Sequence, residues 1–267
     1  MIVLDFGIDG KTALVTAASR GIGYGVASVL ASEGCRVVIS SRNQDALDHA
    51  RKKIVEGTGN KEVLAIRADL AIKSDIEQLI VSAQDRLGTV DILAYNTGPP
   101  KPGTFADLSD ADWQYGVELL LLSAVRLAHG VVPGMVKKGW GRMIFITSTT
   151  LRQPIPNLLL SNTIRLSLAG LSKSLAVEYG PKGITSNGIM QGHILTDRQK
   201  QIAEDVSKRT GKKVEEAMKQ VLTGVPLGRY GTVEEIGYLA AFLASDKAGY
   251  INGAMIPIDG GLIRSVF

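Results

Sequence analysis

Short runs of β-branched and apolar residues alternate along the chain with longer segments whose apolar positions recur every three to four residues. The short runs predict strands at residues 12–16, 36–40, 62–66, 90–95, 142–147, 183–189 and 254–258. Between them, spacings such as Val26, Val29 and Leu30 predict amphipathic helices. This alternation continues through the whole chain. It therefore favours an α/β fold with right-handed crossovers and a parallel sheet covered by helices on both faces.

The composition fits one domain. The chain has 267 residues, of which 45% are hydrophobic and 21% charged, as expected for a globular protein with a substantial core. No repeat or linker divides it, so we expect a single domain over residues 1–267. The segment 197–224 breaks the alternation with two short amphipathic patterns near the carboxyl end of a strand. We expect it to be a lid over a site or, alternatively, a solvated surface hairpin.

Charge and apolar content narrow the classes of partner. The net charge of +4 is small, and the basic run KRTGKK at 208–213 has no aromatic residues interleaved, so we expect no nucleic-acid partner. The apolar region 117–136 contains Glu118 and Arg126, which indicates a buried helix and no membrane span. The single Cys35 cannot form an internal disulfide and fits a cytoplasmic location.

A strand, a turn and the start of a helix follow one another in TALVTAASRGIG, residues 12–23. Gly21 and Gly23 stand where the helix begins, and the free backbone N–H groups of such a helix end can bind a pyrophosphate. In the first strand–turn–helix unit of such a chain, this glycine pair predicts a dinucleotide site. We expect Ser19, Arg20 and Ile22 of the same loop to lie against the cofactor.

These residues resemble the T-G-x-x-x-G-x-G signature of the short-chain dehydrogenase/reductase family. Thr16, Gly21 and Gly23 match it, and Ala17 stands in place of the first glycine, where its methyl group should crowd the turn only slightly. The resemblance covers nearly the whole chain, including the segments 170–189 and 251–261, and is closest to the 3-oxoacyl-carrier-protein reductases. It implies a single-domain Rossmann fold with a doubly wound, parallel, seven-stranded sheet.

The resemblance also implies where a cofactor would be held. ADL (68–70) looks like the family's adenine-contacting pair, which assigns Asp69 and Leu70 to the adenine. NTG (96–98) resembles the segment that follows the fourth strand, which places Asn96, Thr97 and Gly98 beside the cofactor. QGHILT (191–196) resembles the carboxamide-binding loop, with Ile194 and Thr196 in the binding positions.

The end of the second strand indicates which nicotinamide cofactor binds. An acidic residue at this point would bind the ribose 2′-hydroxyl of NAD, whereas an arginine accommodates the 2′-phosphate of NADP. Here Ser41 holds the acidic position and Arg42 follows it, with Arg20 nearby in the glycine loop. We therefore expect NADP(H) as the cofactor. No metal site is expected.

The catalytic positions depart from the family. The resemblance implies a serine, a tyrosine acid, a lysine one helical turn later and an asparagine that holds a water of the proton relay. Ser148 matches the serine, but Ser161 stands at the tyrosine position, Arg165 at the lysine position and Leu120 at the asparagine position. A serine hydroxyl is a far weaker acid than a phenol, and an arginine stays protonated.

Two functions remain open at this point. In the first, the protein is an NADP(H)-dependent oxidoreductase that reduces a carbonyl substrate, such as a 3-oxoacyl thioester, a ketone or a quinone. Ser148, Ser161 and Arg165 would then polarise the carbonyl group, and water or another group, such as His193, would supply the proton. In the second, the protein binds NADP(H) as a sensor or as a structural or regulatory protein with little hydride transfer.

Consecutive leucines suggest a partner subunit. Leu119–Leu122 and Leu158–Leu160 lie on two long helices predicted at 111–132 and 158–179. They are more than one core-facing stripe requires, so we expect a homo-oligomer, a tetramer or dimer, as the resemblance also implies. A helix buried inside one subunit is the alternative.

Overall fold

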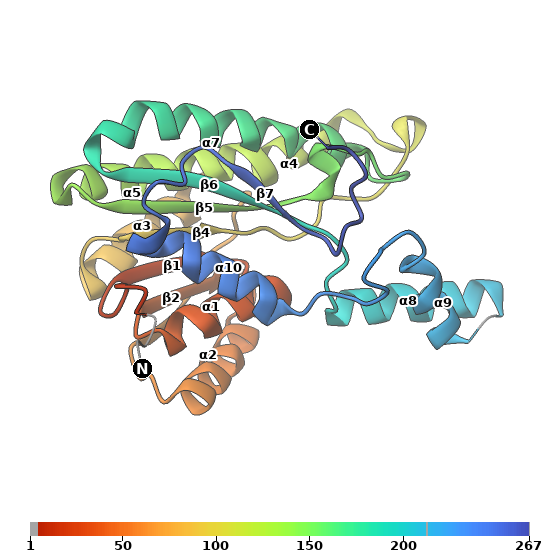
Figure 1. The fold of residues 1–267 in the computed structure, drawn as a ribbon, viewed down its shortest axis with the longest axis horizontal. Helices are drawn as coiled ribbons and strands as arrows, with labels where there is room; N and C mark the ends of the chain where they lie inside the picture. Colours follow the sequence, from red (N-terminus) through yellow and green to blue (C-terminus); the bar gives the residue numbers. More distant parts are fainter. Residues whose placement is uncertain (1–4, 212, 267) are drawn as a thin grey trace.

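Seven parallel strands form one twisted sheet in the computed structural model, which describes residues 5–211 and 213–266 (Figure 1). The strand order is β3-β2-β1-β4-β5-β6-β7. The strands are β1 (Thr12–Thr16), β2 (Arg36–Ser41), β3 (Val63–Arg67), β4 (Ile92–Tyr95), β5 (Gly141–Ser148), β6 (Ile184–Gln191) and β7 (Met255–Ile258). All pairings are parallel, so the predicted α/β Rossmann architecture is confirmed.

Helices cover both faces of the sheet. The first face carries α1 (Gly21–Ser32), α2 (Gln44–Thr58) and α10 (Val233–Ala244), and the second carries α3 (Lys73–Leu87), α5 (Ser123–Lys138) and α7 (Leu166–Tyr179). Shorter elements are α4 (Asp110–Val117), the π-helical turn η2 (Glu118–Leu122) and α6 (Leu159–Ile164). The order changes direction between β1 and β4, and a crevice at the carboxyl ends of the strands is expected there.

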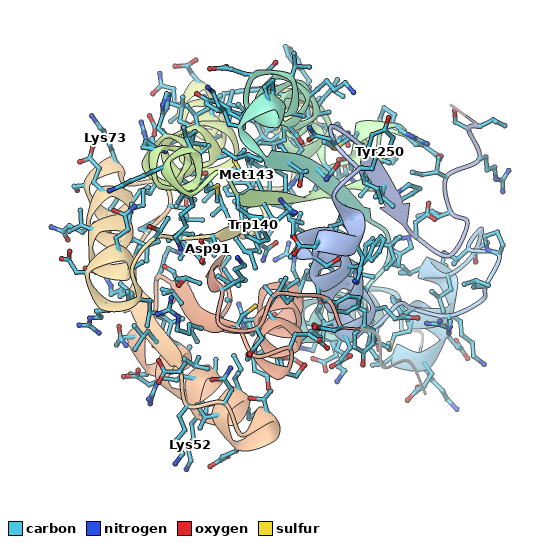
Figure 2. The ribbon with its side chains drawn as sticks, turned by 60° about the vertical axis from the view of Figure 1, so that its left-hand side comes forward. Lys52, Lys73, Asp91, Trp140, Met143 and Tyr250 are labelled. Atoms are coloured by element: carbon cyan, nitrogen blue, oxygen red, sulfur yellow. The ribbon has the colours of Figure 1, made fainter. Side chains whose placement is uncertain are left out.

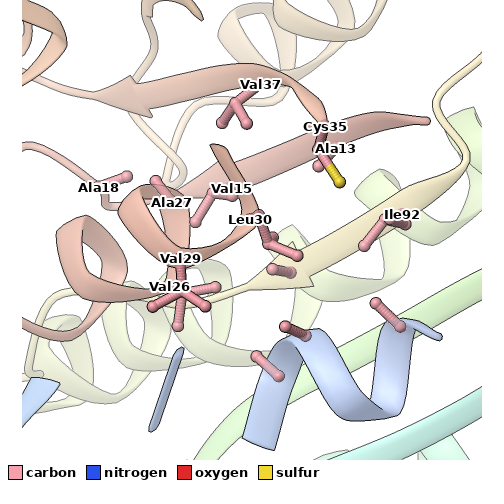
Figure 3. Packing of buried hydrophobic residues seen from close by; sticks show 14 of the residues in the cluster. Ala13, Val15, Ala18, Val26, Ala27, Val29, Leu30, Cys35, Val37 and Ile92 are labelled. Atoms are coloured by element: carbon pink, nitrogen blue, oxygen red, sulfur yellow. The ribbon is translucent and has the colours of Figure 1, made fainter. Parts of the chain in front are cut away.

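Two buried clusters, one on each face, form the core. Figure 3 shows the first, in which Val26, Val29 and Leu30 of α1 pack toward Val15 of β1 and Ile92 of β4. The helices α1 and α10 approach closely through glycines on facing turns. A Cβ atom on Gly25 would lie 2.6 Å from the Val233 Cβ atom, so no larger residue fits there. This packing fixes the start of α1 relative to the sheet.

Polar and ionic contacts stabilise the edge of the sheet at which the strands begin, opposite their carboxyl ends. The Asp91 carboxylate accepts hydrogen bonds from the Thr12 backbone N–H (3.0 Å) and the Lys138 Nζ (2.6 Å). The Arg142 guanidinium lies 4.3 Å from the centre of the Trp140 ring. In Figure 2, Asp91 and Trp140 lie toward the middle of the molecule. This edge is therefore structural, which leaves the carboxyl edge for a functional site.

The two long predicted helices differ from their expected form. The first continues past Pro133 to Lys138 and contains the π-turn η2. The second divides at Arg165 into α6 and α7. The leucines are also less exposed than predicted, because Leu119, Leu120 and Leu160 belong to the core and the other four are half-buried.

The segment 197–224 contains α8 (Asp197–Thr210) and α9 (Val214–Val221), which project from the body of the molecule (Figure 1). Two backbone hydrogen bonds join the chain before the segment to the chain after it. The Leu195 N–H donates to the Gly231 oxygen (2.8 Å), and the Gly231 N–H donates to the His193 oxygen (3.0 Å). Part of the basic run 208–213 lies outside the described residues.

One stretch of described helix, Asp110–Lys138, is long and apolar enough to cross a membrane by length and composition alone. Its most apolar window has a mean hydropathy of 1.7, and half of that window is buried inside the protein. Leu127 and Val131 of this stretch belong to the cluster that packs against the sheet. Its apolar character is thus explained by a core position.

Candidate cofactor and active site

The glycine loop between β1 and α1 has the geometry of an anion site. Arg20 precedes α1 in extended conformation and provides no side-chain cap, so the first N–H groups of the helix face outward without a side-chain acceptor. A Cβ atom on Gly23 would lie 2.4 Å from the Ala17 carbonyl oxygen, so only glycine fits where the helix meets the strand. Ser19 and Ile22 are partly exposed on the same loop.

The effect of Ala17 on the loop differs from the expected one. Its φ angle is +48°, in the left-handed region that favours glycine. The departure from the family signature therefore affects backbone conformation, and the expected crowding of the turn is not the main consequence.

Thr16 has a supporting position. Its side chain is fully buried; its hydroxyl donates to the Asn96 carbonyl oxygen (2.7 Å) and accepts from the Asn96 N–H (2.9 Å). The Asn96 side-chain amide in turn donates to the Ala17 carbonyl oxygen (3.4 Å). These bonds tie the ends of β1 and β4 together beneath the glycine loop, so Thr16 shapes the site without facing it.

Exposed cations gather at the end of β2. Ser41 and Arg42 lie at its carboxyl end, and the Arg42 Nη1 contacts the Tyr115 hydroxyl at 3.4 Å. Arg67 at the end of β3 donates from Nε to the Arg42 carbonyl oxygen (3.2 Å). Sequence reasoning missed Arg67, although the register that pairs Ser41 with Arg67 follows from parallel pairing of β2 and β3. The cluster suits a phosphate group.

The proposed adenine residues lie at the next loop. The Asp69 carboxylate accepts a hydrogen bond from the Ala71 N–H (3.0 Å), and the Asp69 N–H donates to the Asp75 carboxylate (2.9 Å). Leu70 is buried in the core beside them. The loop is therefore held in one shape by its own side chains.

The loop after β6 reaches the glycine loop. A Cβ atom on Gly21 would lie 3.5 Å from the Thr196 Cγ2 atom, so the two segments are in contact distance. The Thr196 hydroxyl accepts from the Gln199 N–H (3.4 Å) and caps α8, while Ile194 is buried. The glycine loop and the 191–196 loop thus lie against each other, and their roles toward a cofactor stay predictions.

The serine positions are joined through a threonine that sequence reasoning missed. The Ser148 hydroxyl oxygen accepts from the Thr150 N–H (3.2 Å), which leaves the Ser148 O–H free to donate. The Thr150 hydroxyl contacts the Ser161 hydroxyl at 3.4 Å. Ser161 is 7% exposed. Thr150 therefore links the two serines, through its backbone N–H to Ser148 and through its hydroxyl to Ser161, and we call these three residues the hydroxyl cluster.

Arg165 is a buried cation beside this cluster. It follows Ser161 by one helical turn, is 8% exposed, and donates from Nη2 to the Thr97 hydroxyl (3.0 Å). Burial lowers the pKa of Arg165 because desolvation disfavours the charged form. Thr97 follows β4, and next to it a Cβ atom on Gly98 would meet open space. The contact joins the fourth strand to the sixth helix at the carboxyl edge.

The asparagine position is altered in a further way. Leu120 is fully buried within the π-turn, and its carbonyl oxygen accepts a hydrogen bond from the Tyr95 hydroxyl (2.9 Å). The same hydroxyl lies 2.7 Å from the Ser123 Oγ atom. Burial raises the pKa of Tyr95 above its usual value. Tyr95 therefore holds the turn closed and is not a free acid.

The arrangement can bind an anionic dinucleotide and polarise a carbonyl oxygen with hydroxyl donors and a fixed positive charge. In the part of the chain that the structure describes, no cluster of His, Cys, Asp and Glu could hold a metal ion. His193 lines a separate cavity of about 80 Å³ with residues of 227–235 and 258–260. Burial lowers its pKa, so it is neutral at pH 7.

Comparisons with known proteins agree with this geometry. A family model described as enoyl-(acyl carrier protein) reductase matches residues 16–263. The chain is 34% identical to the 3-oxoacyl-acyl-carrier-protein reductase FabG of Escherichia coli (strain K12), over 95% of this chain and 98% of that one. L-sorbose reductase of Gluconobacter frateurii, solved with NADPH and L-sorbose, superposes with a TM-score of 0.95 at 33% identity, covering 98% and 100% of the two chains.

A second solved structure is relevant to the altered catalytic positions. It is a short chain oxidoreductase from Pseudomonas aeruginosa PAO1 that contains an atypical catalytic center, with a TM-score of 0.90 at 25% identity over 98% and 100% of the chains. The fold and the site define a dinucleotide-binding oxidoreductase architecture. The chain belongs to the short-chain dehydrogenase/reductase family.

Proposed function

We propose that this protein is an NADP(H)-dependent oxidoreductase that reduces a small-molecule carbonyl substrate through an altered active site. The observation that carries the proposal is the buried Arg165 guanidinium, bound to Thr97 and one turn beyond Ser161. It retains a positive charge where the family has a lysine. The NADPH named with L-sorbose reductase and the exposed Arg20 and Arg42 support the choice of cofactor.

The residues of the site fit the cofactor. The uncapped start of α1 offers N–H groups to the pyrophosphate, and Arg42 and Arg20 offer charge to a 2′-phosphate. Arg165 can also donate to a ribose hydroxyl. When bound, NADPH would supply the hydride.

The side chains of the site would polarise the substrate carbonyl and stabilise the charge that develops on its oxygen. The free O–H of Ser148 donates to the substrate oxygen, and Ser161 supplies a second donor from the same cluster. Arg165 stabilises the negative charge that develops there because it cannot lose its own proton. The proton then comes from water. Removing one such donor typically lowers kcat about 100-fold to 1000-fold.

The substrate classes under this proposal are 3-oxoacyl thioesters, ketones and quinones. The name of the Escherichia coli relative supports an acyl thioester, and L-sorbose in the neighbouring structure supports a small ketone. A homo-oligomeric state, a cytoplasmic location and a lid at 197–224 remain predictions.

The second candidate is an NADP(H)-binding sensor or regulatory protein. The hydrogen bond from Tyr95 to Leu120 favours it, because the carbonyl group at the family's relay position is already occupied. The two candidates differ in turnover and agree in cofactor binding.

Assays of NADPH oxidation with a panel of carbonyl compounds distinguish the two candidate functions. We expect oxidation of NADPH, followed by its absorbance, with at least one ketone, quinone or 3-oxoacyl thioester, and a kcat about 100-fold lower in Ser148→Ala. Tight NADPH binding with no turnover of any compound contradicts the reductase. An unchanged kcat in Ser148→Ala removes that serine from the mechanism.

A further inference from the structure

The positive charge of Arg165 has no carboxylate partner among the residues that the structure describes. None of the ion pairs formed by the described residues includes its guanidinium. Its hydrogen-bond partner is the neutral Thr97 hydroxyl, and its backbone belongs to the α6–α7 helix pair. A buried, unpaired cation is costly, so the site is prepared to receive an anion or a strong hydrogen-bond acceptor.

The side chains linked to this residue in the fold are hydroxyls that do not ionise near neutral pH. The guanidinium donates to the Thr97 hydroxyl, and the Arg165 backbone N–H donates to the carbonyl oxygen of Ser161, whose hydroxyl contacts that of Thr150. The pKa of an alcohol lies far above neutrality, close to that of water. These groups can therefore donate hydrogen bonds to an oxyanion, but they cannot readily give it a proton.

Two titratable side chains at the carboxyl edge, Tyr95 and His193, make contacts other than a hydrogen bond to Ser161 or Arg165. The Tyr95 hydroxyl is fully buried against the Leu120 carbonyl and Ser123, and burial raises its pKa. His193 lines the cavity formed with residues 227–235 and packs edge-on to Tyr230. Among the residues with described side chains, none with a pKa near neutrality contacts Ser161 or Arg165.

A site of this kind favours substrates whose reduced form is a stable anion. Hydride addition to an isolated ketone leaves an alkoxide, whose conjugate acid has a pKa close to that of water. Hydride addition to a quinone leaves a phenolate, whose conjugate acid has a pKa of about 10. The second anion is much less basic than the first, so it needs no acid within the site.

Building on the proposed reductase activity, we propose that the Ser161–Arg165 pair selects quinones over isolated ketones and 3-oxoacyl thioesters. The hydride that bound NADPH would supply leaves the nicotinamide carbon and bonds to one quinone oxygen, and the ring π electrons move onto the other oxygen. Arg165 and the hydroxyl cluster hold that oxygen as a phenolate. Water then supplies one proton, so the quinone is reduced and the cofactor oxidised by two electrons each.

The first experiment compares turnover under anaerobic conditions. A naphthoquinone, cyclohexanone and an acetoacetyl thioester are each offered with NADPH, and the reaction without protein is subtracted. We expect kcat/KM for the quinone to exceed both others by about 100-fold or more. If kcat/KM for the ketone or the thioester equals or exceeds that for the quinone, the proposed selectivity is wrong, but the proposed reductase activity is supported. Silence with all three, alongside NADPH binding, is a failure of the proposed function itself.

The second experiment measures the anion site without turnover. A nitrophenol is titrated with the protein and NADP⁺, and its ionised form is followed by its visible absorbance. We expect the pKa of the bound nitrophenol to fall by one unit or more in the unaltered protein and in Arg165→Lys, and to lose this shift in Arg165→Met. Removal of a distant exposed cation in Arg86→Met, at the end of α3, should leave the shift intact.

Thermal unfolding of each variant confirms that it is folded, and Arg165→Lys provides a conservative alternative if Arg165→Met does not fold. A nitrophenol pKa equal to its solution value in the unaltered protein contradicts the anion site. The same pKa shift in Arg165→Met as in the unaltered protein removes Arg165 from it.

Discussion

At the scale of single residues, two positions of the glycine loop, seven residues apart counted inclusively, favour glycine for different reasons. Ala17 takes a left-handed backbone conformation that costs an L-residue about 1 kcal/mol or more. Gly23 takes an ordinary conformation but has no space for a side chain, because its Cβ atom would meet the Ala17 carbonyl oxygen. The first position favours glycine for its conformation and the second for its size.

Substitutions at these positions should therefore change stability in opposite directions. We expect Ala17→Gly to raise the free energy of unfolding by roughly 1 kcal/mol, since glycine adopts a positive φ without strain. Gly23→Ala should lower it by about 2 kcal/mol or more, because the new methyl group overlaps backbone. Chemical denaturation of the two variants beside the unaltered chain tests both, and a loss of stability in Ala17→Gly contradicts the strain argument.

Tyr95 holds the π-turn through a buried hydrogen bond. Tyr95→Phe removes the donor from the buried Leu120 carbonyl and should cost about 1–3 kcal/mol in unfolding free energy. Tyr238→Phe is the matched control; its side chain is 60% exposed, so we expect a change within about 0.5 kcal/mol. Equal effects in the two variants would mean that the buried bond adds nothing measurable.

Arg42 is expected to distinguish the two nicotinamide cofactors. Loss of a charge-assisted hydrogen bond to the 2′-phosphate should weaken NADPH about tenfold or more in Arg42→Ala and leave NADH affinity unchanged. Fluorescence titration with each cofactor measures this, and Arg86→Ala serves as a control for the loss of one charge. A parallel weakening of NADH would place Arg42 in folding or in another part of the cofactor site.

At the scale of elements, strands were predicted within one or two residues, whereas helix details were not. Strand positions follow from runs of β-branched residues, which local sequence contains. The π-turn at 118–122 and the division at Arg165 depend on packing against the sheet and on contacts such as that of Tyr95 with Leu120. These contacts join distant positions, so no local pattern could reveal them.

The segment 197–224 is the element best placed to move. The chain on either side of it is joined by the hydrogen bonds of Gly231 with His193 and Leu195, while α8 and α9 project from the body. We propose that it closes over bound cofactor and substrate.

Limited digestion with trypsin tests this motion. Cleavage after the exposed Lys208 and Lys213 should come first in the free protein and slow several-fold with NADPH and a nitrophenol present. Cleavage at an unchanged rate contradicts closure.

At the scale of the whole molecule, the family and the doubly wound parallel sheet were accessible from the sequence, whereas the strand order was not predicted and the cofactor-binding residues stay predictions. The glycine loop and the 191–196 loop carry recognisable residues, and parallel topology brings them together at one edge. The hydroxyl cluster was only half predicted, because Thr150 links Ser148 to Ser161 through a turn whose shape is not encoded in either serine.

Subunit association remains to be measured. The structure buries three of the leucines that suggested an interface, but it leaves Leu166 and Val177 of α7 51% and 69% exposed. We expect a dimer or tetramer by light scattering, with α7 at the contact. Charged substitutions such as Val177→Glu should then shift the mass toward the monomer. A monomeric unaltered chain rejects the expectation.

The closed π-turn has a consequence for how this active site can change. Restoring the family pair with Ser161→Tyr and Arg165→Lys returns an acid and its cation, yet the Leu120 carbonyl stays occupied by the Tyr95 hydroxyl. Removal of the Tyr95 hydroxyl alone leaves a buried carbonyl group unpaired and costs stability. The positions of the site therefore depend on one another, and no single substitution in this chain provides both an acid at position 161 and a free Leu120 carbonyl.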